Sequence, residues 1–199
     1  LNGGSVSESR FGHNSAAPGD GAISVTAAGD IVLNSGAGSG GRIRTTQSVS
    51  LTAGGTVSES GNNAFIVGDG TTNPSLAVSA ATGVALTSNA NEISSVSISN
   101  STSGAVSFVN NKALSIAAGG ITNSGRNVTL DNIGAVMEAG VITAGGLELL
   151  EHGAGATYTL TQSNSVGKLA ANTSGGALQF TNAGAFSVDT VNTAGITSS

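Results

Sequence analysis

The residues with reactive side chains are few and mostly scattered. His13 and His152 are the only 2 histidines, and His152 directly follows Glu151 and stands four residues after Glu148. Two carboxylates and one imidazole at this spacing are the best local set for acid–base chemistry or metal binding. No third ligand or orienting partner accompanies them, so polar residues at a surface corner are the favoured interpretation. We therefore expect no catalytic residue, no cofactor and no metal site.

Three Asn-X-Ser/Thr motifs mark candidate glycosylation sites at Asn100, Asn127 and Asn172. Such motifs accept N-linked sugar when they lie on the surface of a secreted protein. The chain is rich in Asn, Ser and Thr, so chance also produces these motifs. Both interpretations remain open from the sequence.

Composition excludes several classes of protein. Charged residues make up 9% of the 199 residues and the net charge is -5, which has the wrong sign for binding nucleic acid. Cys is 0, which excludes disulfides and thiolate metal sites and suits a chain that is exported unfolded. No apolar run approaches the roughly 20 residues of a membrane helix, so we expect no membrane insertion.

The elements that must position these side chains are predicted to be strands. In "ISVTA", Ile23 and Val25 alternate with Ser24 and Thr26, which gives one aliphatic face and one hydroxyl-bearing face. Clusters of Gly and Asn separate such stretches, as tight corners require. Aromatic residues are 3% of the chain and Gly counts 31, so the interior must be narrow and filled by Val, Ile, Leu and Ala.

The spacing of similar phrases predicts how the strands stack. Apolar residues recur every twenty positions, and two such series form the expected interior ladders: Leu76, Val96 and Ile116, and Ile66, Leu86 and Val106. A period of twenty with local alternation predicts a right-handed parallel β-helix, or β-solenoid, as one domain over residues 1–199. Its expected size is about ten coils spaced about 4.8 Å apart. The stretches "GSGGRIRTT" and "GNNAFIVGDGTTNP" exceed this period and are expected to be bulging corner loops.

Two phrases, "ISVTAAGDIVLNSG" and "LSIAAGGITNSGRNVTLDN", resemble the repeats of filamentous haemagglutinin-type exoproteins and repeat-rich autotransporter adhesins of Gram-negative bacteria. The resemblance covers most of the chain through composition and periodicity. It implies a right-handed parallel β-helix, secretion to the cell surface, and roles in adhesion, aggregation or biofilm formation.

Two classes of function follow from these expectations. The first is a structural or adhesive segment of an extracellular or cell-surface fibre, whose partners are other copies of itself and host or matrix glycans. The alternative is a polysaccharide-binding or polysaccharide-degrading β-helix. The chain has only 6 Lys and Arg, 1 Tyr and no Trp, which disfavours an enzyme of this kind. Neither terminal sequence contains a capping helix, so we expect more chain or another molecule to continue the stack.

Overall fold

The computed structural model describes residues 2–3, 6–8, 10–12, 21–35, 40–153 and 155–198, of which the first three ranges are described by backbone only. These residues form β-strands and turns, with no helix among them and hence none that could cross a membrane. The strands are β1 (Asn2–Gly3), β2 (Val6–Glu8), β3 (Arg10–Gly12), β4 (Ile23–Ala27), β5 (Ile31–Asn34), β6 (Arg42–Arg44), β7 (Val49–Ala53), β8 (Val57–Ser60), β9 (Phe65–Val67), β10 (Ser75–Ala80), β11 (Val84–Leu86), β12 (Ser95–Asn100), β13 (Val106–Asn110), β14 (Leu114–Asn132), β15 (Ala135–Glu138), β16 (Ile142–Leu150), β17 (Thr157–Thr173), β18 (Leu178–Asn182), β19 (Ser187–Val188) and β20 (Ile196–Ser198).

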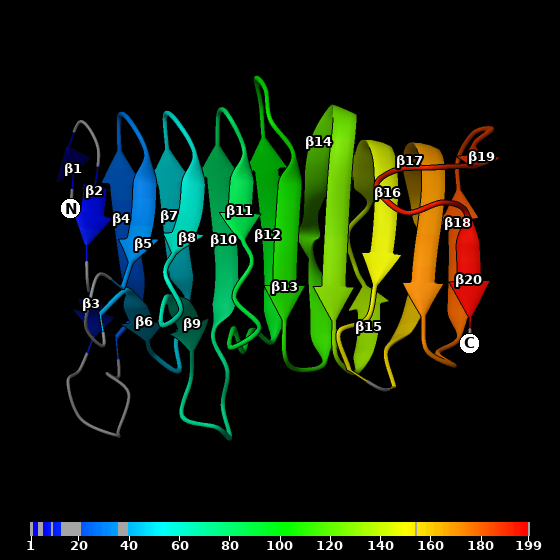
Figure 1. Ribbon diagram of the computed structural model, residues 1–199. Coiled ribbons are helices and arrows are strands. Elements are labelled where there is room, and N and C mark those ends of the chain that lie inside the picture. The colour runs from blue at the N-terminus through cyan, green and yellow to red at the C-terminus, as the bar shows by residue number, and fades with distance from the viewer. Residues whose placement is uncertain are drawn as a thin grey trace.

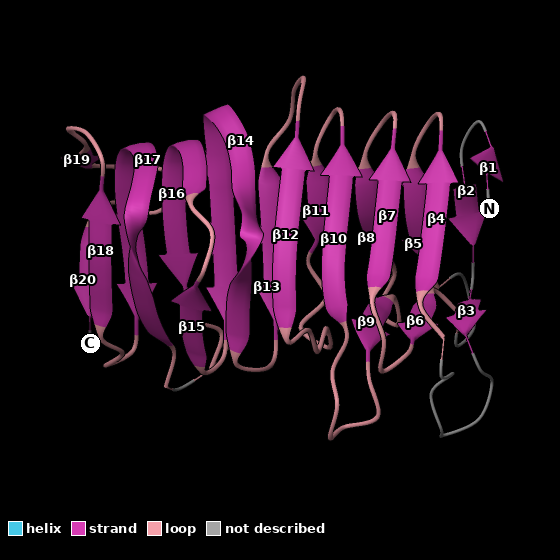
Figure 2. Ribbon diagram, turned by 180° about the vertical axis from the view of Figure 1, so that it is seen from behind, coloured by secondary structure: helices cyan, strands magenta, loops and turns pink. Residues whose placement is uncertain are grey.

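The strands wind into a flattened rod. In Figure 1, β4, β7, β10 and β12 rise along the far side, and β5, β8, β11 and β13 descend along the near side. Figure 2 shows the rising strands in front, so the chain climbs one face, crosses the top and descends the other face as it advances. This path is a right-handed β-solenoid, and all pairings between successive coils are parallel, as predicted. Strands β14 and β17 each turn the corner without interruption (Figure 1).

One predicted ladder is confirmed. Leu76 pairs with Val96, and Val96 pairs with Ile116, at the twenty-residue spacing that the sequence suggested. All three side chains are buried, because each occupies an inward position of a rising strand. The outward neighbours Ser95 and Ser115 also pair with each other. Inside and outside were therefore assigned correctly along this face.

The second predicted ladder is wrong, although its three residues are all buried. Leu86 pairs with Phe108, and Val106 pairs with Val84, which is 22 positions earlier. The cause is the top turn: three residues (81–83) join β10 to β11, but five (101–105) join β12 to β13. Gly104 makes the longer turn possible at φ +79, where a Cβ would lie 2.1 Å from the carbonyl oxygen of Thr82.

A separate sheet of three short strands replaces the two expected corner loops. Strands β3, β6 and β9 pair in parallel, and Ile66 on β9 pairs with Ile43 on β6. This is why Ile66 lies outside the predicted ladder. The stretches "GSGGRIRTT" and "GNNAFIVGDGTTNP" thus each contain a strand. Within the second, the turn at Asp69 is local, because its carboxylate accepts the N–H groups of Thr71 and Thr72 at 2.8 and 2.6 Å.

The third strand enlarges the coils that contain it. Partners on the rising face are 26 residues apart from Ile23 to Val49 and 27 apart from Val49 to Leu76, but only 20 apart from Leu76 to Val96. The average coil has roughly 22 residues, and the described strands make about 8 turns instead of the expected ten.

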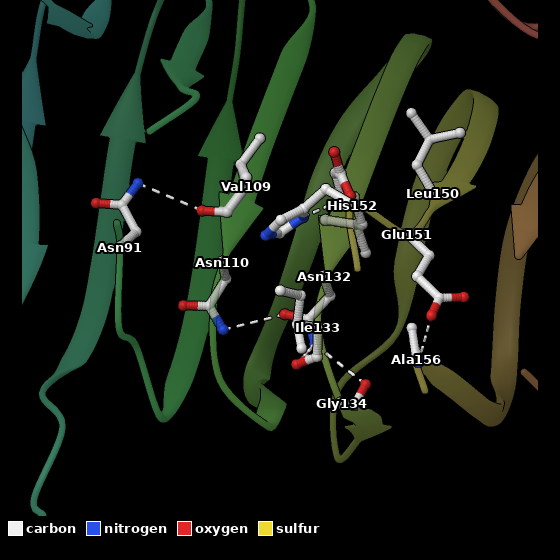
Figure 3. Close-up of polar contacts among 12 residues, drawn as sticks. Asn91, Val109, Asn110, Asn132, Ile133, Gly134, Leu150, Glu151, His152 and Ala156 are labelled. Atoms are coloured by element: carbon white, nitrogen blue, oxygen red, sulfur yellow. Dashed lines mark hydrogen bonds and ion pairs between the residues drawn. The ribbon is translucent and has the colours of Figure 1, made fainter. Parts of the chain in front are cut away.

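Buried asparagines stabilise the corners where coils change direction. Asn110 donates to the side-chain oxygen of Asn132 in the next coil at 3.0 Å, and Asn100 donates to Asn123 at 2.9 Å (Figure 3 shows the first pair). The oxygen of Asn110 also accepts the backbone N–H of Ile93 at 2.7 Å. These side chains form hydrogen bonds with groups at the corners that have no partner in a neighbouring strand. A buried polar group without a hydrogen bond would be costly there.

Candidate functional site

The cluster singled out in the sequence does not form one site. Glu151 accepts the backbone N–H of Ala156 at 3.2 Å, whereas the His152 ring turns the opposite way and contacts Asp131 (Figure 3). Glu148 lies on the outward face of β16 but is only 1% exposed. No group of three metal-ligating side chains occurs among the described residues, and His13 lies outside them.

Glu148 is covered by a strap formed by residues 189–194. The strap leaves the coil after β19 and crosses the outer face of β16 and β17 before it enters β20 (Figure 1). Asn192 donates to Glu148 at 2.6 Å, and the Thr193 N–H donates to its other oxygen at 2.6 Å. Burial raises the pKa of Glu148, but the hydrogen bonds from Asn192, Thr129 and Thr193 outweigh it and leave the pKa below its usual value. Glu148 therefore serves as an anchor for the strap.

The three candidate glycosylation sites differ in how far their asparagine side chains are exposed to solvent. Asn100 is 2% exposed, and its amide donates to Asn123 and to the Ser103 carbonyl, so in the folded chain it is unavailable for a glycan. Asn127 is partly buried on β14. Asn172 is exposed on β17, where its oxygen accepts the hydroxyl of Thr197 at 3.2 Å. Only Asn172 combines the motif with an exposed side chain.

A groove of about 610 Å³ runs across the lower edge of the descending face. It begins at Glu59 on β8, passes the turn after β11 and Val109 on β13, and ends at Asp131 and His152. Apart from Gly61, its other lining residues carry amides and hydroxyls: Asn62, Thr87, Ser88 and Asn89. The groove is thus built from successive coils rather than from one loop.

The imidazole of His152 lies at one end of this groove. Its Nδ1 is 2.8 Å from Oδ1 of Asp131, in the preceding coil. This contact orients the ring and, in the neutral form, places the proton on Nδ1. The Nε2 atom is buried without a hydrogen-bond partner among the described residues.

Glu59 lies at the other end, at an inward position. It pairs with buried Leu33, so its carboxyl group replaces a hydrocarbon side chain in an interior row. Its Oε2 accepts the N–H of Ser88 at 2.8 Å and the amide of Asn91 at 3.2 Å, whereas Oε1 is buried without a partner in the described part of the chain. Burial raises the pKa of Glu59 to about 7, and these hydrogen bonds offset only part of that rise.

The two acids of the groove are far apart along the rod. The path from β8 through β11 and β13 to β14 takes three strand steps. At about 4.8 Å per step, the backbones of Glu59 and Asp131 are separated by about 14 Å.

Glu138 repeats the arrangement of Glu59 in a later coil. It pairs with the inward residue Ile116, accepts the Asn164 amide at 3.0 Å and has a buried, unpartnered Oε2. Burial raises its pKa as well. Neither glutamate was predicted from the sequence. Each could have been recognised as an acid at a position where the alternation of apolar and polar residues calls for an aliphatic side chain.

The last coil presents a different surface, because β18, β19 and β20 pair only with β17 among the described strands. Val188 pairs with buried Leu169, and Ile196 pairs with buried Ala171, so both continue interior rows. Nevertheless Val188 is 56% exposed and Ile196 is 45% exposed. Within the described part of the chain, this face therefore carries exposed apolar residues of the interior rows and strands that have a partner on one side only.

Comparison of the chain with known family models, with curated proteins and with solved structures found no match in any of the three.

Proposed function

We propose that the chain is a structural, adhesive segment of a fibre outside or on the surface of a bacterial cell, in which further β-coils stack on its last coil. The observation that carries the proposal is the open face at β18, β19 and β20. Apolar residues of interior rows gain burial there when another coil covers them. Parallel strand edges are templates for pairing with the next strand.

The rest of the rod suits such a role. Its outer rows carry mostly small polar side chains, such as Ser95 and Ser115, which allow many weak lateral contacts. The absence of cysteine fits export in an unfolded state, and the repeats resemble those of secreted adhesins. We propose no catalytic role for the chain.

The proposal is tested by changing one exposed apolar residue at the open end. Val188→Lys places a charge where the next coil would stack, so it should weaken end-to-end association. Sedimentation velocity and electron microscopy over a range of concentrations measure the effect. We expect the unmodified chain to form longer rods as concentration rises.

Met137→Lys is the matched control. Met137 is 60% exposed, like Val188, but lies on the side of the rod on β15. The control should associate like the unmodified chain. A monomer at every concentration, or equal loss of association in both variants, would contradict stacking at the open end.

A further inference from the structure

The small sheet of β3, β6 and β9 holds a large share of the chain's positive charge. The whole chain has 6 Lys and Arg, and Arg10, Arg42 and Arg44 all belong to these strands. The three strands contain neither Asp nor Glu. In Figure 1 the sheet lies along the lower edge of the rod, at the end far from β18. It is therefore a positive region on a chain whose net charge is -5.

The register brings these basic positions together. Arg10 pairs with Arg42 across neighbouring strands, and Arg44 stands two positions further along β6. Ile43 between the two arginines of β6 is fully buried, so Arg42 and Arg44 occupy outward positions, where each is half-buried. Neighbouring strands are about 4.8 Å apart, and positions two apart in one strand are about 6.6 Å apart. Like charges this close destabilise a sheet, so an anion bound between them is favoured.

Arg42 is oriented by an aromatic ring instead of an acid. The central carbon of its guanidinium group lies 4.8 Å from the centroid of the Phe65 ring, in the next coil. This contact holds the guanidinium plane in place but does not neutralise its charge. In the described part of the chain Arg42 forms no ion pair, whereas Lys112 and Lys168 each pair with an acid, at 3.3 and 2.8 Å. An oriented guanidinium group without an acid can donate two parallel hydrogen bonds to a carboxylate.

The small extent of the sheet favours a sparsely charged ligand. Its arginines occupy two neighbouring strands, about 4.8 Å apart along the rod. Duplex DNA carries one negative charge per about 1.7 Å, so most of its phosphates would lie over other parts of an acidic chain. An extended anionic membrane would meet the same repulsion. A polymer with neutral groups between its carboxylates avoids this repulsion, and polysaccharides of uronic acids have that chemistry.

We propose that the outer face of β3, β6 and β9 binds a carboxylate-bearing polysaccharide. Arg42 donates to one carboxylate, and the charges of Arg10 and Arg44 strengthen the attraction. The site belongs to the first coils, whereas the proposed stacking uses the last coil. The ligand can therefore bind without rods, and rods can form without the ligand.

The test uses a galacturonic acid tetramer as the probe, with isothermal titration calorimetry at low salt as the measurement. The fully methyl-esterified tetramer is the comparison, because it has the same length but no charge. Arg42→Gln should raise Kd by roughly tenfold, because it removes a charge-assisted pair of hydrogen bonds. Arg42→Lys keeps the charge but loses the planar group, so it should also weaken binding, by a smaller factor.

Arg126→Gln is the control variant. It removes the same charge from β14, where Arg126 lies outside the small sheet and donates to the carbonyl oxygens of Ser124 and Thr102. Kd should stay unchanged. Thermal unfolding verifies that each variant is folded, and Arg42→Lys decides the test if Arg42→Gln unfolds. Absence of binding, equal binding of the ester, equal loss in Arg126→Gln, or tighter binding of a short DNA duplex would overturn the proposal.

Discussion

Glu59 shows how one buried side chain makes the stability of the solenoid depend on pH. Its carboxyl group stands in a row with Leu33, where the charged form is poorly solvated. In the unfolded chain the same group has its ordinary pKa of 4.5, and in the folded chain its pKa is about 7. Folding therefore favours the protonated form. The contribution of Glu59 to the stability of the fold is fully present below pH 4.5, where the group is protonated, and is lost as the pH rises through 7.

Glu59→Gln should remove the loss of stability that ionisation of Glu59 causes at high pH. At pH 8 the variant should be more stable than the unmodified chain by on the order of 3 kcal/mol, because a shift from 4.5 to about 7 corresponds to that free energy. At pH 4.5 the two proteins should be nearly equally stable. Urea unfolding at both pH values measures the difference.

Glu148→Gln provides a comparison of opposite sign. The pKa of Glu148 is lowered in the folded chain, so its contribution is present above its unfolded pKa and is lost on acidification. This variant should be less stable than the unmodified chain at pH 8. A Glu59→Gln variant that is destabilised at pH 8 as well would show that Glu59 is held as a carboxylate.

At the scale of single elements, the sequence predicted faces better than registers. Alternation within a strand depends only on neighbouring residues, so the inward positions of Leu76, Val96 and Ile116 followed directly from the spacing. Register between coils depends on the length of every turn between two strands. Two extra residues in the turn at 101–105 moved the partner of Leu86 from Val106 to Phe108.

The candidate site was less predictable for the same reason. Asp131 and His152 are 21 residues apart, and Glu59 and Asn91 are 32 apart, so their contacts depend on the register of several coils. The strap is a stronger case, because Asn192 reaches Glu148 across 44 residues. No local pattern marks a segment that leaves its coil and returns over the outer face of the sheet.

The strap should depend on the absence of a side chain at Gly146. A Cβ atom there would lie 2.8 Å from the side-chain oxygen of Asn127, which would have to turn away, and 3.1 and 3.2 Å from the two methyl carbons of Val191, which is also tighter than ordinary packing. Gly146→Ala should therefore displace residues 189–194 and speed their amide exchange. Hydrogen exchange read by mass spectrometry measures this locally.

Gly184→Ala is the matched control for the strap. A Cβ at Gly184 has no atom within 4 Å, and the residue is not among those with positive φ. Exchange in residues 189–194 should remain slow in this variant. Equal exchange in the two variants would mean that Val191 does not hold the strap in place.

The whole molecule is a one-dimensional stack, and this determines where it opens first. Coils contact mainly the coils before and after them, so stability is shared between neighbours rather than across one central core. Central strands such as β12 and β14 have partners on both sides, whereas β18 and β20 have a described partner on one side only. Local opening of the last coil therefore breaks fewer contacts than opening at the centre.

Native-state hydrogen exchange on dilute and concentrated samples should reveal both this gradient and the proposed stacking. In dilute solution we expect the slowest exchange in β10–β16 and the fastest in β18–β20, because the outer edge of the last coil has no neighbour among the described strands. When the concentration rises, protection should increase in β18–β20 while exchange at the centre stays constant, since end-to-end stacking involves the ends of the rod and not its centre. Val188→Lys should abolish the increase without changing the centre. Uniform exchange along the rod would contradict the one-dimensional description, and protection that rises equally in all strands would indicate association through the sides of the rod instead of its end.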